Sequence, residues 1–152
     1  MVISFSEIML NIKLGHYKYI GSGSCRKVFD LRNGYVIKVA KNSAGIAQNK
    51  SEYKISTEDK SNLFAKVIQV SEDYALLIMQ KADKISSISY VWRYFNVTSK
   101  KQLFKLKELQ NIKKNYELIL DDFSRKSNWG MINGKCVIID YGYTKDVMKR
   151  YY

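Results

Sequence analysis

The sequence has few of the residues on which metal centres and disulfide-rich folds depend. Its 152 residues contain no proline, one histidine and two cysteines. Cys25 and Cys136 lie far apart without C-x-x-C spacing, so we expect free reduced thiols and no zinc site. His16 stands alone, and we interpret it as a solvated or capping residue rather than a catalytic one.

Long apolar runs are also missing. No segment approaches the roughly 20 apolar residues of a membrane span, and the first residues lack the apolar stretch of a signal peptide. We therefore expect a cytoplasmic protein without membrane contact. The length and a hydrophobic content of 46% favour a single domain over residues 1–152.

Acidic residues are scarce, because 14 Asp and Glu stand against 26 Lys and Arg, for a net charge of +12. A basic surface with 12 tyrosines and two tryptophans can bind nucleic acid through phosphate contacts and base stacking. The lysines are dispersed and no RNA-binding or helix-turn-helix signature is present, so a solvated basic surface is favoured and a nucleic-acid-binding protein stays an alternative. Abundant Lys, Asn, Ile and Tyr are typical of an AT-rich coding genome, which would suit a phage or a mobile element.

Two of the eight glycines stand in residues 21–28 (GSGSCRKV). Glycines in a turn between strands let backbone N–H groups come close to phosphate oxygens. Ten residues after Val28, Lys38 lies inside the apolar strand 35–40 (YVIKVA), where its charge can reach the same anion. The pattern predicts a nucleotide-binding loop, although taken alone it also fits a glycine-rich hairpin with a snorkelling lysine.

Other segments follow this loop in a definite order. They are a helix-like segment at 44–56 with Glu52, an apolar hairpin at 64–71 and 74–79, the tripeptide Asn128-Trp129-Gly130, and a strand at 136–139 that ends in Asp140-Tyr141-Gly142. In this order they resemble the protein-kinase fold, from about Tyr19 to Gly142. The resemblance implies an α+β protein with an antiparallel N-lobe sheet and one helix in about residues 1–80. A reduced helical C-lobe follows in about residues 85–152, after a hinge near 81–84.

The resemblance implies ATP and Mg²⁺ as cofactors and a role for each matched residue. In the N-lobe, Gly21 and Gly23 match the glycine-rich loop, Val28 the residue over the adenine, Lys38 the catalytic lysine on the third strand, and Glu52 its ion-pair partner. Met79 matches the gatekeeper, and Gln80 to Ala82 match the hinge whose backbone binds adenine. In the C-lobe, Asn128 and Asp140 match the metal ligands, the latter in a D-Y-G version of D-F-G.

Three features depart from the kinase pattern. Arg26 stands at the third loop glycine, so its side chain either points away from the phosphates or contacts them. The H-R-D motif is missing, and five residues instead of four separate Asp122 from Asn128, so a catalytic base at Asp122 requires a remodelled loop. Ten residues follow Gly142, and we expect the activation segment and the large substrate-binding helices to be absent.

These observations support two functional hypotheses beside nucleic-acid binding. The first is an ATP- and Mg²⁺-binding, weak phosphotransferase acting on a protein, and the second is a pseudokinase-type binding module or inhibitor without catalysis. Either would act through a macromolecular partner, a protein in first place or a nucleic acid. The candidate partner residues are Lys100, Lys107, Lys114, Arg125, Lys126 and the tail 149–152, with Trp92 and Tyr151 as aromatic anchors.

Local patterns predict the remaining elements. Asn33-Gly34 and Asn133-Gly134 each predict a β-hairpin, and Glu72-Asp73 a third. Ser99 and Gln102 predict the start of a helix with one apolar face and a lysine stripe opposite. Its apolar face comprises Leu109, Ile112, Tyr116, Ile119 and Leu120, and the stripe Lys100, Lys107 and Lys114. A further helix is expected at about 87–95, with Ile88, Val91, Trp92 and Phe95 in packing roles.

Overall fold

The computed structural model describes residues 4–152, which divide into two compact units. The first unit comprises the chain up to Thr57 together with Lys66–Lys81. The second unit comprises Glu58–Ala65 together with Ala82–Tyr152. The chain therefore passes from the first unit to the second at Glu58, back to the first at Lys66, and to the second again at Ala82.

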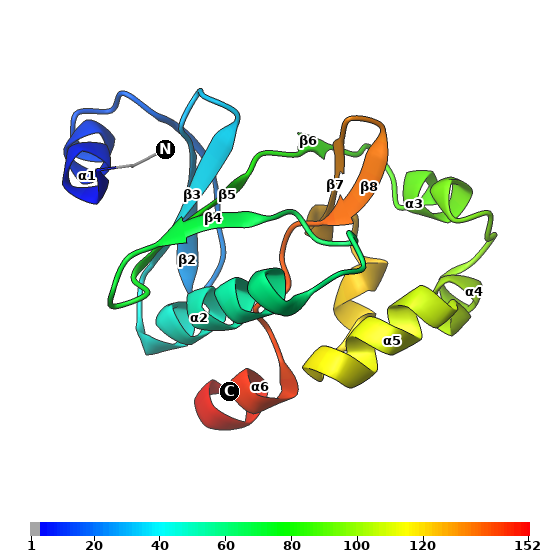
Figure 1. Cartoon of the computed structure of the whole chain (residues 1–152). Coiled ribbons are helices and arrows are strands. Elements are labelled where there is room, and N and C mark those ends of the chain that lie inside the picture. Colours follow the sequence, from blue (N-terminus) through cyan, green and yellow to red (C-terminus); the bar gives the residue numbers. More distant parts are fainter. Residues whose placement is uncertain (1–3) are drawn as a thin grey trace. The chain divides into compact units, whose positions relative to one another are not determined.

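The first unit is built on a five-stranded antiparallel sheet in the order β1-β2-β3-β5-β4. The strands are β1 (Lys18–Ser22), β2 (Arg26–Asp30), β3 (Tyr35–Ala40), β4 (Val67–Val70) and β5 (Leu76–Gln80), and the helices are α1 (Phe5–Lys13) and α2 (Ser43–Glu58). Successive side chains of a strand point to opposite faces. Ile37 and Ile78 pair across the sheet and pack with Ile8 of α1, whereas Lys38 binds Glu52 of α2 on the other face. Figure 1 shows α1 and α2 on different sides of these strands.

Tight turns join neighbouring strands in both units. The β2–β3 turn contains Gly34 at φ 90°, and Asn33 Oδ1 accepts a hydrogen bond from the amide of Tyr35. Asn133 and Gly134 both have positive φ in the turn between β7 (Trp129–Ile132) and β8 (Lys135–Ile138). The β4–β5 pairing gives the third hairpin. All three predicted hairpins are therefore confirmed.

The second unit combines a small sheet with short helices. Its sheet has the order β6-β7-β8, where β6 is Asp83–Lys84. The helices are α3 (Ser89–Tyr94), α4 (Lys100–Lys105), α5 (Lys107–Tyr116), the 3-10 helices Leu120–Ser124 and Lys126–Asn128, and α6 (Lys145–Tyr151). Trp129, Phe123 and Tyr141 are almost fully buried at its core. Val91 of α3 is also buried, which confirms its packing role.

The helix predicted from Ser99 onward is wrong in its extent. Ser99 Oγ does accept the amide of Gln102, so the predicted start is confirmed. Leu106, however, has an extended ψ of 137° that separates α4 from α5, and α5 ends before Glu117, which is left-handed at φ 53°. Ile119 and Leu120 therefore lie beyond the helix, and Lys100 lies on a different helix from Lys107 and Lys114.

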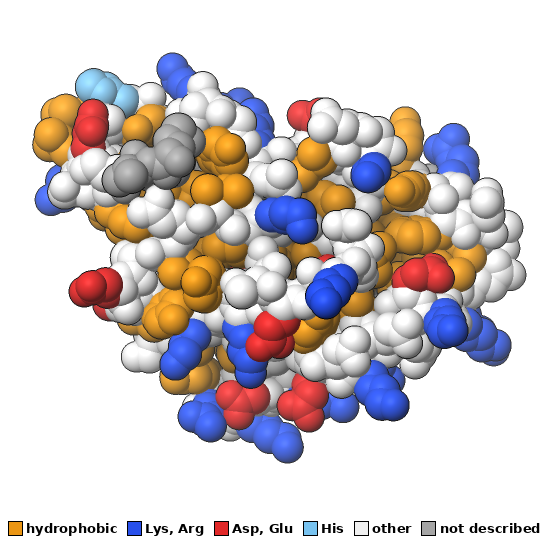
Figure 2. Space-filling model, viewed as in Figure 1, with side chains coloured by type: hydrophobic (Ala, Val, Ile, Leu, Met, Phe, Trp, Pro, Cys, Tyr) orange, Lys and Arg blue, Asp and Glu red, His pale blue; other side chains and the backbone are white. Residues whose placement is uncertain are grey.

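Basic side chains are spread over the surface. On the face shown in Figure 2, Lys and Arg occur singly or in small groups among neutral atoms. Lys100, Lys107 and Lys114 are all exposed, as is Tyr151, whereas Trp92 is only partly exposed. Within residues 4–152, no helix is both long enough and apolar enough to cross a membrane.

Candidate functional site

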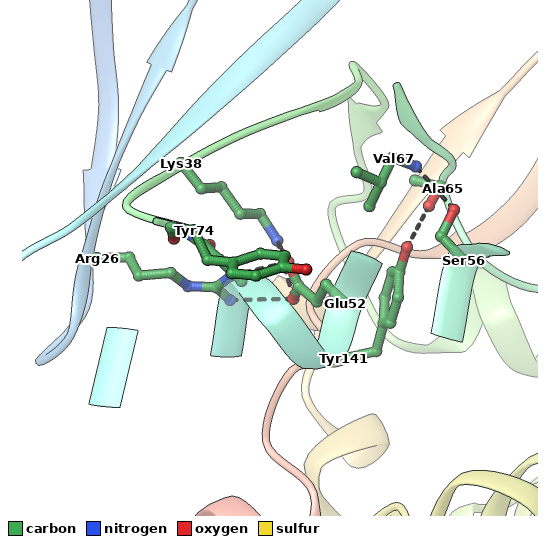
Figure 3. Close-up of polar contacts among 9 residues, drawn as sticks. Arg26, Lys38, Glu52, Ser56, Ala65, Val67, Tyr74 and Tyr141 are labelled. Carbon is green, nitrogen blue, oxygen red and sulfur yellow. Dashed lines mark hydrogen bonds and ion pairs between the residues drawn. The ribbon is translucent and has the colours of Figure 1, made fainter. Parts of the chain in front are cut away.

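The centre of the first unit is a buried cluster of three charged side chains (Figure 3). Lys38 Nζ lies 2.9 and 3.2 Å from the two carboxylate oxygens of Glu52. Arg26 binds the same carboxylate in a bidentate manner, with Nη1 and Nη2 at 2.8 and 3.0 Å. Lys38, Arg26 and Glu52 are exposed by only 5%, 6% and 0%. We refer to these three residues as the charged triad.

The charged triad keeps Glu52 ionised. Burial alone raises the pKa of a carboxyl group, but the charges of Arg26 and Lys38 and their hydrogen bonds outweigh it and lower the pKa of Glu52 to about 2. The three side chains carry two positive charges and one negative charge. The cluster thus places a fixed positive excess next to β3, which is the charge balance that favours a phosphate group nearby.

Helix α2 meets the sheet through a face that is largely polar. Its buried residues are Gly45, Asn49, Glu52 and Ile55, at the spacing of one helix face. Asn49 accepts a hydrogen bond from Arg26 Nη1 at 3.0 Å and donates to the backbone carbonyl of Tyr74 at 2.9 Å. Arg26 is therefore directed at α2, which decides the question that the sequence left open. Neither Asn49 nor the Arg26 contact was predicted, because hydrophobic periodicity does not detect a polar buried face.

The glycine-rich loop has open space around its glycines. A Cβ added at Gly21 or Gly23 would meet no atom within 4 Å, and neither residue has a positive φ. The fold itself does not require glycine at these two positions, so their use fits a loop that a ligand approaches closely. Lys41 Nζ donates to the carbonyl of Gly23 at 2.7 Å, and the amide of Lys41 donates to Cys25 O. These two hydrogen bonds hold the loop next to the end of β3.

The predicted adenine-binding residues occupy β2, β5 and the segment after it. Val28 pairs with Lys38 and Gly21 across the sheet, and Met79 is 1% exposed. The amides of Gln80 and Lys81 already donate to the carbonyls of Lys66 and Gly34. These two amides thus have partners within the protein, and the binding of adenine by the backbone of Gln80 to Ala82 stays a prediction.

The second unit brings together the residues expected to hold the metal and the nucleophile. Asn128 Nδ2 donates to the backbone carbonyl of Asp122 at 2.6 Å, and Asn128 O accepts the amide of Ile139, next to Asp140. Burial raises the pKa of Asp122, Arg125 lowers it, and the negative charges of Asp140 and Asp121 raise it further. Asp122 and Asp140 are thus close enough to interact, despite the extra residue before Asn128.

The donor set of the second unit suits a hard cation in part. The Asn128 amide nitrogen is committed to Asp122, which turns the amide oxygen toward other partners, and Asp140 contributes an exposed carboxylate. Magnesium prefers such oxygen ligands and keeps several waters besides one or two protein groups. In the part of the chain that the structure describes, no group of three or more His, Cys, Asp and Glu could hold a metal ion. The residues present therefore fit a cation that is shared with a phosphate ligand rather than a closed protein cage.

Comparison with known proteins identifies the fold. No family model and no curated protein matches the sequence. The structure is similar to the aminoglycoside phosphotransferase APH(2")-IIa in its ternary complex with streptomycin and ATP, with a TM-score of 0.52 and 19% identity over 93% of this chain and 72% of that one. A second structure, the complex of APH(2")-IIa with gentamicin, gives a TM-score of 0.50 and 18% identity over 93% and 71%. The protein-kinase-like fold predicted from the sequence is thereby confirmed.

The predicted site residues thus form two groups, one in each unit. Lys38 and Glu52 form an ion pair in the first unit, joined by Arg26, and Gly21, Gly23, Val28 and Met79 lie on the strands around it. Asp122, Asn128 and Asp140 are neighbours in the second unit. The roles of these residues toward a nucleotide and a metal remain predictions.

Proposed function

We propose that the protein binds ATP together with Mg²⁺ and is a phosphotransferase. The observation that carries the proposal is the charged triad in a protein-kinase-like fold. A buried lysine held by a glutamate on the facing helix offers a fixed ammonium group to phosphate oxygens, and fixed charges cost no reorganisation when a ligand binds. The similar structure that contains ATP supports the same reading.

The residues divide the binding of the nucleotide among them. Gly21 and Gly23 would let the loop backbone approach the phosphates, Lys38 would contact them, and the backbone of Gln80 to Ala82 would bind the adenine. Asn128 and Asp140 would hold Mg²⁺, which, when bound, neutralises charge on the phosphate oxygens. Glu52 and Arg26 would act indirectly, by holding Lys38 in place.

Asp122 is the candidate catalytic base. Burial and the neighbouring carboxylates raise its pKa against the opposing charge of Arg125, so it accepts a proton more readily than an ordinary aspartate. The carbonyl of Asp122 is held by Asn128, which fixes the 3-10 helix that carries it. The contact with Asn128 supports the proposal that the loop can serve this role despite the five-residue spacing.

The net charge bears on the acceptor of the phosphoryl group. Streptomycin and gentamicin, which the similar structures bind, are cationic, and a protein with a net charge of +12 repels cations. An acidic protein is the acceptor that this charge favours, with exposed Lys100, Lys107, Lys114, Arg125 and Lys126 as the attracting groups. We therefore propose a protein acceptor, and nucleic acid as the second polyanionic candidate.

Turnover of γ-labelled ATP tests the proposal, with an acidic protein such as casein, an RNA or gentamicin added as acceptor. We expect Asp122→Asn to lower turnover by about 100-fold, the usual contribution of a general base, and to leave ATP binding unchanged. Asp146→Asn, which changes an exposed aspartate on α6 outside the candidate site, is the matched control and keeps full activity.

Three results would contradict the proposal or a part of it. Turnover that survives Asp140→Asn would indicate a contaminating kinase or a wrong site. ATP binding without any turnover would favour the pseudokinase-type binding module instead. Transfer to gentamicin alone would exclude the protein acceptor.

A further inference from the structure

Tyr141 follows the predicted metal ligand Asp140 and is tied to a distant part of the second unit. It is 1% exposed, and its hydroxyl donates to the backbone carbonyl of Ala65 at 2.6 Å (Figure 3). Its ring lies 4.4 Å from the ring of Phe64, measured between centroids. A phenylalanine would make the same ring contact, so the hydroxyl adds one specific anchor to this packing.

The carbonyl that Tyr141 binds is itself held in place. Ile138 donates its amide to Leu63 O at 2.7 Å and accepts the amide of Ala65 at 2.9 Å. Residues 63–65 therefore lie along β8 as a short parallel partner, bridged at Phe64 and Ile138. Ala65 is fully buried, so its carbonyl would lose its partner if the Tyr141 hydroxyl were removed.

Asp140 lies between two fixed points of the backbone. On one side, Ile139 donates its amide to Asn128 O at 2.9 Å. On the other side, the side chain of Tyr141 is bonded to Ala65, which pairs with Ile138. The segment 138–141 is thus closed into a ring of hydrogen bonds, and Asp140 is the exposed residue within it.

We propose that the Tyr141 hydroxyl is a positioning group that holds the Asp140 segment in one conformation beside Asn128. The carboxylate is then preset for the cation before any ligand arrives. This inference rests on the proposed function for its consequence, but the restraint itself belongs to the protein without ligands. Tyr141 acts only through Asp140 and touches neither the nucleotide nor the metal.

Tyr116 provides a matched control within the same unit. Its hydroxyl donates to Asp59 Oδ1 at 3.2 Å, and its ring lies 6.1 Å from Phe64. Tyr116→Phe therefore removes a tyrosine hydroxyl that is hydrogen-bonded to the same Glu58–Ala65 segment. It leaves the hydrogen bond between Tyr141 and Ala65 in place. Any effect of Tyr141→Phe that Tyr116→Phe lacks belongs to the Asp140 segment.

Amide hydrogen exchange of the ligand-free protein, resolved by NMR, tests the restraint directly. In Tyr141→Phe we expect the amide of Ile139 to exchange about three to ten times faster, the factor that loss of one hydrogen bond gives. In the same variant the amide of Leu109, a buried residue of α5, should keep its wild-type exchange rate. In Tyr116→Phe the amides of Ile139 and Leu109 should both keep their wild-type exchange rates. Unchanged exchange of Ile139, or an equal increase at Leu109, would overturn the inference.

A magnesium titration of ATP binding tests the consequence. Tyr141→Phe should need about three to ten times more Mg²⁺ for half-maximal ATP binding, with unchanged affinity for ATP in EDTA. If Tyr141→Phe loses the same ATP affinity with and without Mg²⁺, the role of the Tyr141 hydroxyl is merely structural. If the wild-type protein binds no ATP, the proposed function fails, whereas the exchange experiment still decides whether Tyr141 holds the segment.

Discussion

Glu52 is shared between two cations, and this sharing defines the candidate site at the level of single residues. Removal of one partner from a buried ion pair leaves a charge without compensation and is strongly destabilising. Lys38 and Arg26 reach Glu52 from neighbouring strands, so the loop, the sheet and α2 are joined at one carboxylate. Arg26, at the position of a missing glycine, therefore binds Glu52 and belongs to the charged triad.

Replacement of Arg26 tests this role. Arg26→Ala should lower the free energy of unfolding at pH 7 by about 3 kcal/mol, because Glu52 loses its bidentate partner and Asn49 one hydrogen bond. Urea denaturation measures the change. Lys54→Ala, on the exposed side of α2, should stay within about 0.5 kcal/mol of the wild type.

The same variant has a defined pH dependence. The folded-state pKa of Glu52, about 2, lies below its ordinary value of 4.5. The ionised carboxylate therefore makes its full contribution to the free energy of unfolding above pH 4.5, and this contribution is lost as the pH falls toward 2. Without Arg26 the folded-state pKa is higher and less stability is lost in that range. The difference in the free energy of unfolding between wild type and Arg26→Ala should therefore become smaller from pH 5 to pH 3. A difference that stays constant would show that the charge of Arg26 does not stabilise the ionised Glu52.

At the level of elements, local signals were sufficient for the three hairpins and for the start of α4, but not for the break between α4 and α5 or for the end of α5. Asn-Gly turns predict strand pairing because the left-handed backbone is readily available there. The break at Leu106 has no such signal, since α4 and α5 are both rich in lysine and no glycine or proline separates them. The helices α1 and α6 were also not predicted, although Ser4 and Thr144 cap them with their hydroxyl oxygens.

Helix α2 supplies the prediction at this scale. A Cβ at Gly45 would overlap the carbonyl oxygen of Cys25, a backbone atom of the loop that cannot yield easily. Gly45→Ala should cost a net of about 1 to 2 kcal/mol of unfolding free energy, because overpacking outweighs the gain in helix propensity. Gly21→Ala, in open space, should stay within about 0.5 kcal/mol, and thermal or urea unfolding would compare the two. Equal stability of both variants would refute the close contact.

At the level of the whole molecule, the order of segments carried the fold prediction further than any single motif. The G-x-G pair alone fits many hairpins, but its order with Lys38, Glu52 and Asp140 led to the kinase-like fold that the similar structures confirm. The net charge of +12 predicted no particular acceptor, because the basic side chains are dispersed and fit several polyanionic partners. The acceptor must therefore be identified by experiment.

The central claim is that this chain binds MgATP through the lysine of the charged triad. Calorimetric titration with ATP and Mg²⁺ of the wild type, Lys38→Ala and Lys54→Ala tests it most directly. Lys54 lies on the exposed side of α2, outside the glycine-rich loop, so its replacement removes the same charge without changing the triad. We predict that Lys38→Ala weakens binding at least about tenfold, as expected for a hydrogen bond to a charged group, and that Lys54→Ala does not. No binding by the wild type at millimolar ATP, or equal affinity of wild type and Lys38→Ala, would contradict the claim.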